Sequence, residues 1–114
     1  MQVRLVSTLQ LGDRIVGPTP DTAANWALYQ RYAKRLQARL GIGFQVYLDT
    51  SDGYDLLHAR DYDTDTSWVV AASIYQSLVD SEVLTHHRII ALADQDLILK
   101  NTVDLERQLR MPQS

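Results

Sequence analysis

The chain of 114 residues contains no cysteine, and this absence removes several kinds of chemistry at once. Without a thiol there can be no cysteine nucleophile, no thiolate metal site and no disulfide framework. A chain without cysteine is also suited to a reducing compartment, so we expect a cytoplasmic protein.

Long apolar runs are missing as well. No stretch approaches the roughly 20 consecutive apolar residues that a membrane-spanning helix needs. The first residues, MQVRLVSTLQLGD, lack the apolar core of a signal peptide. We therefore predict that the protein has no membrane partner.

An excess of positive charge is the third absence, since the net charge is −3. Arg31, Lys34, Arg35 and Arg39 gather on one side of a predicted helix, which is typical of a solvated helix face. A phosphate-binding stripe would be more convincing in a basic chain. We therefore predict no nucleic-acid partner.

The remaining composition is that of an ordinary globular protein, with 46% hydrophobic and 22% charged residues. A chain of this length suits one domain, residues 1–114, and can fold without a metal or a disulfide. Its acidity is concentrated in residues 49–65, where six aspartates and one arginine give a local charge of −5.

The first half of the chain predicts a strand, a helix and a β-hairpin. Residues 3–11 alternate as a strand does, and Gly12-Asp13 could fold it back onto 14–16. A helix should begin at the N-cap Thr19 and end near Leu40, before Gly41. Its apolar stripe comprises Trp26, Tyr29, Ala33, Leu36 and Leu40.

The hairpin is expected over residues 44–60, with strands at 44–50 and 54–60 joined by the turn Ser51-Asp52-Gly53. Four further elements follow: a helix at 65–83, a strand at 88–94, a strand at 97–101 that could pair with it, and a helix at 102–111. The order β-α-β-β-α-β is that of the ferredoxin-like α+β sandwich, with two helices on one face of an antiparallel sheet.

Asp61, Asp63 and Asp65 stand at alternate positions in RDYDTDTSW and suggest a calcium loop. An EF-hand loop beginning at Asp61 would need Gly at position 6 and Glu at position 12, where this chain has Thr66 and Ala72. Capping of the predicted helix explains these aspartates better. We predict no metal and no cofactor.

Candidate catalytic residues are few. The chain has no nucleophile elbow, paired-histidine zinc motif or phosphate loop. His86 and His87 are adjacent, so their side chains diverge on a strand or a helix. His58 could face a pocket with Tyr47 or Tyr54, but the sequence gives it no partner for acid–base catalysis.

Tyrosine and aspartate alternate in the predicted hairpin, and this pattern suits a surface that contacts a basic protein. We therefore predict a small non-enzymatic interaction domain, similar in role to an adaptor or inhibitor. Its partner-binding residues would be Tyr47, Asp49, Asp52, Tyr54 and Asp55.

The predicted strands are apolar on both faces, while two helices cover only one. The other face must be covered by the terminal helix or by a second subunit, and we predict a homodimer. The alternative function is a ligand-binding or enzymatic dimer with a pocket between sheet and helices, around His58, Trp26 and Trp68.

Overall fold

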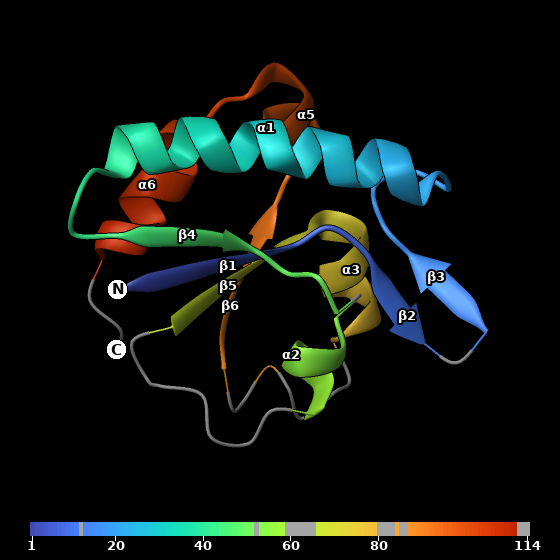
Figure 1. The fold of residues 1–114 in the computed structure, drawn as a ribbon. Helices are drawn as coiled ribbons and strands as arrows, with labels where there is room; N and C mark the ends of the chain where they lie inside the picture. The colour runs from blue at the N-terminus through green and yellow to red at the C-terminus, as the bar shows by residue number, and fades with distance from the viewer. Residues whose placement is uncertain (12, 52, 59–65, 80–83, 85–86, 112–114) are drawn as a thin grey trace.

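A computed structural model describes residues 1–11, 13–51, 53–58, 66–79, 84 and 87–111. This part of the chain forms six strands and five helices, which Figure 1 shows. Their order is β1 (Gln2–Val6), β2 (Leu9–Leu11), β3 (Arg14–Val16), α1 (Thr22–Leu40), β4 (Gln45–Leu48), α2 (Tyr54–His58), β5 (Thr66–Ala71), α3 (Ala72–Ser77), β6 (Arg88–Leu92), α5 (Asp94–Leu99) and α6 (Val103–Arg110).

The main sheet has four parallel strands in the order β4-β1-β5-β6. A separate antiparallel pair joins β2 to β3. The expected mixture of helices and strands is confirmed, but the ferredoxin-like antiparallel sheet is wrong. Parallel neighbours need a crossover between them, and α1 supplies it between β1 and β4.

Helices cover the sheet in layers. Helix α1 contacts β1 and β4, and both α5 and α6 contact α1. Figure 1 shows these three helices on one side of the sheet and α2 on the other. The terminal helix therefore lies beside α1, and not on the second face as the sequence analysis allowed.

The two faces of the sheet carry different side chains. Val46 and Leu48 of β4 line a shallow groove with residues of α1, so they face that helix. Tyr47, between them, must point to the opposite side because successive strand residues alternate. Trp68 and Val70 of β5 are fully buried, and the buried apolar residues form one cluster.

The predicted hairpin at 44–60 is wrong in its second half. Strand β4 forms, but it pairs with β1, and Tyr54–His58 is a helix. The Asp49 carboxylate accepts hydrogen bonds from the backbone N–H groups of Ser51 and Gly53, at 3.3 and 3.0 Å. Ser51 Oγ then accepts one from the Asp55 N–H at 3.0 Å. These contacts begin a helix, so the turn signal is a helix cap.

The predicted helix at 65–83 is also wrong at its start. Thr66–Ala71 forms β5, and within the described residues 66–79 the helix spans Ala72–Ser77. All six residues of β5 are buried, as expected of a central strand covered on both faces. Such a strand shows no alternation, which allowed the helical spacing of Trp68, Ala72 and Tyr75 to dominate the pattern.

The N-terminal strand is shorter than expected, because β1 ends at Val6 and β2 begins at Leu9. The fold-back is confirmed: β2 and β3 pair with Leu11 opposite Arg14. Helix α1 begins after Asp21, whose carboxylate accepts from the Ala23 and Ala24 N–H groups, and not after Thr19.

The end of α1 is confirmed, with Gly41 as its C-cap at φ +82°. Tyr29, Leu36 and Leu40 are buried as the stripe predicts, whereas Trp26 is more than one-third exposed. Asn25 and Tyr32 complete the buried side.

Near the C-terminus, β6 and α6 match the expected strand and helix. The strand predicted at 97–101 is wrong, because Asp94–Leu99 is a helix. That helix ends at Lys100, which has a left-handed conformation with φ 55°.

Candidate functional site

The carboxyl edge of the parallel sheet is the first place to look for a ligand site. In open α/β sheets, ligands bind where two neighbouring strands lead to helices on opposite faces. Here β1 leads to α1 and its neighbour β5 leads to α3; right-handed crossovers place these helices on opposite faces. The polar residues that follow the four strands are Ser7, Thr8, Asp49, Ser73 and Asp94.

The hairpin β2–β3 packs into this edge. Leu9 is fully buried, and a Cβ placed on Gly53 would lie 2.3 Å from its Cδ1. Ser73 Oγ donates to the Gly17 carbonyl at 3.0 Å, and a Cβ on Gly17 would lie 2.5 Å from Asn25 Nδ2. The crevice that other α/β proteins leave for a ligand is therefore occupied by the β2–β3 hairpin and by Gly17, which follows it.

A shallow hollow of about 360 Å³ remains beside the hairpin. It is lined by residues 14–20 and Ser77, and Arg14 is the one charged side chain among them. Asn25 holds the neighbouring loop: its Oδ1 accepts from the Thr19 N–H and hydroxyl, and its Nδ2 donates to the Thr19 carbonyl. The hydrogen bonds between Asn25 and Thr19 stabilise the loop. The residues that line the hollow do not form a catalytic arrangement.

Asp49, predicted as a partner-binding residue, is almost completely buried. Its carboxylate accepts hydrogen bonds from Ser51 Oγ at 2.8 Å and from the two backbone groups that begin α2. Asp49 therefore organises the loop between β4 and α2. Asp52 lies outside the described residues, and Asp55 is half-buried in the first turn of α2.

The two predicted tyrosines lie at the surface on either side of that loop. Tyr47 on β4 is 44% exposed and Tyr54 on α2 is 62% exposed. The Tyr47 hydroxyl donates to Gln45 Oε1 at 3.1 Å. The Arg4 guanidinium carbon lies 5.7 Å from the Tyr47 ring centroid, within the range of a cation–π interaction.

Arg4 also lies over a second ring, 5.8 Å from the Trp68 centroid. The registers place Arg4 beside Tyr47 on one side and beside Trp68 on the other, so all three share one sheet face. His87 contacts Trp68 edge to face, with the ring centroids 6.1 Å apart. Arg4 is not among the site residues predicted from the sequence; the available signal was a basic residue inside the otherwise largely apolar strand β1.

The predicted pocket is not assembled as expected. Trp26 belongs to α1, which covers the sheet face of Val46 and Leu48. Trp68 is fully buried on the opposite face. The sheet therefore separates the two tryptophans. The His58 side chain and His86 lie outside the described residues.

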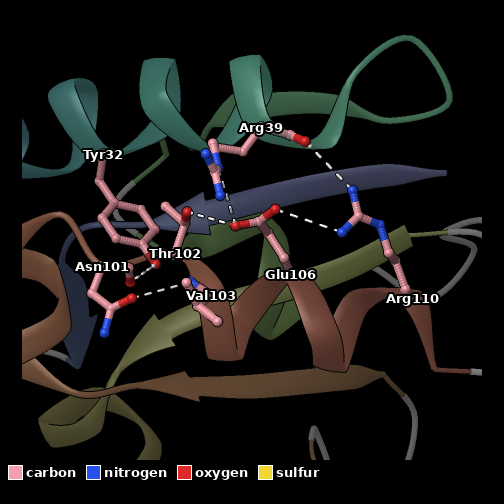
Figure 2. Close-up of polar contacts among 7 residues, drawn as sticks. All are labelled: Tyr32, Arg39, Asn101, Thr102, Val103, Glu106 and Arg110. Carbon is pink, nitrogen blue, oxygen red and sulfur yellow. Dashed lines mark hydrogen bonds and ion pairs between the residues drawn. The ribbon is translucent and has the colours of Figure 1, made fainter.

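A polar network links the end of α1 to α6 (Figure 2). Glu106 Oε2 accepts from Thr102 Oγ1 at 2.8 Å and lies 3.6 Å from Arg39 Nε. Arg110 Nη1 lies 3.5 Å from Glu106 Oε1, and its Nη2 donates to the Arg39 carbonyl at 3.4 Å. The glutamate side chain is 9% exposed, so two arginines and a hydroxyl compensate a largely buried charge.

Two buried tyrosines of α1 have raised pKa values. Burial is the main cause for Tyr29, and the charge of Asp94 raises its pKa further. Burial also raises the pKa of Tyr32, followed by the charge of Asp96. Tyr32 donates its hydroxyl to the Asn101 carbonyl at 2.9 Å, whereas the Tyr29 hydroxyl has no hydrogen-bond partner among the described residues. Both phenols therefore stay protonated at neutral pH.

Within the described ranges, no three His, Cys, Asp or Glu residues lie close enough to hold a metal ion. Asp61, Asp63 and Asp65 lie outside those ranges, so the structure does not test them. No helix of the described chain is long and apolar enough to cross a membrane.

The fold and these surfaces define a small three-layer α/β chain with a parallel sheet and a hairpin packed into its carboxyl edge. The chain matches no protein-family model, and no curated protein or solved structure matches it.

Proposed function

We propose that this chain is a non-enzymatic protein-interaction domain whose contact surface is formed by β4 and α2. The observation that carries the proposal is the presentation of Tyr47. Its ring contacts the Arg4 guanidinium and its hydroxyl is bonded to Gln45, yet 44% of the residue is exposed. A tyrosine held in place loses little entropy on binding and is a frequent hot spot in interfaces.

Tyr54 extends this surface onto α2. The Asp49 carboxylate binds the backbone of the connecting loop, so β4 and α2 have a defined relative position. The half-buried Asp55 contributes a negative charge next to Tyr54 in the sequence, which supports a basic partner. Asp49 is left out of the proposed surface because its carboxylate is engaged inside the loop.

The partner is recognised through side chains and not through an added strand. Strand β4 is at the edge of the sheet, where a free backbone would allow another strand to pair. Gln37 of α1 occupies part of this edge: its Oε1 accepts from the Val46 N–H and its Nε2 donates to the Phe44 carbonyl, both at 2.8 Å. This cover favours Tyr47 over the backbone as the point of contact.

A homodimer remains part of the proposal, on changed grounds. Trp68 and Val70 on the second sheet face are buried, so that face no longer calls for a second subunit. Ile98 and Leu99, both more than half exposed on α5, offer an apolar contact instead. Light scattering should give twice the chain mass of 13.0 kDa, and Leu99→Ser should restore the monomer mass. A monomer mass for the wild type at tens of micromolar would contradict the homodimer.

We also propose that the protein is cytoplasmic.

Capture from an extract of the source organism tests the interaction surface. Wild type, Tyr47→Ala, Tyr54→Ala and the control Val79→Ala, which changes an exposed residue after α3, are immobilised in equal amounts. We expect a protein that wild type and Val79→Ala enrich and that both tyrosine variants lose. If the wild type and all three variants enrich the same proteins, β4 and α2 do not form the contact surface.

A further inference from the structure

A hollow of about 460 Å³ lies between the end of α1 and α6, away from the tyrosine surface. Its size falls within the range of small-molecule sites. Three of the side chains around it are arginines. The lining residues are Arg39, Val103, Glu106, Arg107, Arg110 and Met111.

The arginines retain donors that the protein does not use. A guanidinium has five N–H donors on three nitrogens. Arg39 presents its Nε to Glu106, and Arg107 presents its Nη1 to Asp104 at 3.6 Å. Both terminal nitrogens of Arg39 and the Nη2 of Arg107 have no partner among the described residues. These side chains are 58% and 67% exposed, so an incoming group can reach them.

The charge of the hollow favours an anion. Three arginines and one glutamate line it, and the glutamate is largely buried beneath Arg39 and Arg110. Its carboxylate holds the guanidinium group of Arg39 in place beside that of Arg110, which reduces the entropy lost when Arg39 binds a second anion. Asp104 lies beside Arg107 and offsets one more positive charge. Three arginines and two carboxylates still give the hollow a net positive charge.

The C-terminal ends of α1 and α6 reduce the positive potential of the hollow, because the carbonyl groups at a helix C-terminus carry partial negative charge. Arg110 offsets part of the effect, since its Nη2 binds the Arg39 carbonyl. Arg107 is the arginine that does not contact Glu106, so its charge is the least compensated by the buried carboxylate.

The remaining lining is apolar and accessible, since Val103 and Met111 are each about half exposed. We propose that the hollow binds a small molecule with a phosphate group on an apolar body. The oxyanion would receive hydrogen bonds from Arg39 and Arg107, and the apolar body would contact Val103 and Met111. This site is independent of the proposed protein-interaction surface.

Amide NMR titration in chloride buffer at constant ionic strength tests the site. The probes are phenyl phosphate, inorganic phosphate and phenol. We expect phenyl phosphate to shift the amide signals around Val103 and Met111, with inorganic phosphate weaker and phenol without effect. Equal shifts from phenol would show an apolar site only, and no shift with millimolar phenyl phosphate would overturn the proposal.

Two variants and a control locate the binding residues. Arg39→Gln and Arg107→Gln should each weaken phenyl phosphate binding by about tenfold, as expected for the loss of a charge-assisted hydrogen bond. Arg31→Gln removes an exposed arginine of α1 that does not line the hollow, and should bind as wild type does. Arg107→Gln leaves the Glu106 pairs intact, so it should fold normally. Wild-type affinity in a folded Arg107→Gln variant would contradict the proposal.

Discussion

Gly53 packs so closely against Leu9 that a Cβ on the glycine would lie 2.3 Å from the leucine Cδ1. Gly53 also has φ +83°, a conformation that costs a residue with a side chain about 1–2 kcal/mol. Overpacking a core adds about 1–3 kcal/mol. We therefore expect Gly53→Ala to lower the free energy of unfolding by about 2–5 kcal/mol in a urea titration. Gly43→Ala is the control, because its Cβ meets nothing within 4 Å; equal stability of the two variants would show that the hairpin does not pack there.

Glu106→Gln tests the network between α1 and α6. The substitution keeps the shape of the side chain and removes the charge that faces Arg39 and Arg110. Since both arginines are half exposed, solvent screens these pairs, and we expect a loss of about 1–2 kcal/mol in unfolding free energy. Asp104→Asn is the matched control: its pair with Arg107 is exposed at both ends, so it should change stability by less than about 0.5 kcal/mol. Equal effects would refute a special role for Glu106.

Tyr29 and Tyr32 form a matched pair for a hydroxyl deletion. Tyr32→Phe removes the bond to the Asn101 carbonyl and should cost about 1 kcal/mol. Tyr29→Phe removes a buried hydroxyl without a partner in the described chain, so stability should be unchanged or higher. Thermal melts of the two variants measure the difference. A larger loss in Tyr29→Phe would mean that its hydroxyl is engaged.

The same tyrosines predict alkaline instability. Their pKa values in the folded chain are raised above the ordinary value of about 10, mainly by burial. The unfolded chain releases these protons first, so stability holds below pH 10 and falls as the pH rises above it. Urea midpoints between pH 8 and 11 should decline, and less steeply in Tyr29→Phe. A flat profile in wild type would contradict the burial of these phenols.

Gln37→Leu tests how the sheet edge is protected. The variant leaves the Val46 N–H and the Phe44 carbonyl without the Gln37 side chain. We expect greater self-association at high concentration in sedimentation velocity, because an open edge pairs with other strands. Lys34→Leu, which makes a similar change to an exposed residue of the same helix, serves as the control. Identical sedimentation of the two variants would show that the edge is protected in another way.

Local signals predicted some elements well and others poorly. Helix α1 has a clear 3.6-residue stripe and a glycine at its end, and both are properties of the local sequence. Strand β5 is buried on both faces, so it has no alternating pattern that separates it from a helix. The short helix α2 depends on hydrogen bonds from Asp49 and Ser51, which the sequence shows only as a turn signal.

The pairing of strands and the sites depend on contacts between distant residues. Arg4 meets Tyr47 and Trp68 because β1 lies between β4 and β5, and no local pattern reveals that order. The surface position of Tyr47 and Tyr54 could be predicted. Arg39 and Arg110 are 71 positions apart in the chain, so the contact between them could not be predicted from the sequence.

The central claim is that Tyr47 anchors a protein partner, and isothermal titration with the purified captured protein tests it most directly. We expect Tyr47→Ala to raise the dissociation constant at least about tenfold, since truncating a hot-spot residue costs about 2 kcal/mol or more and tenfold is about 1.4 kcal/mol. Val79→Ala should bind as wild type does. A folded Tyr47→Ala variant that binds this partner with wild-type affinity would contradict the claim.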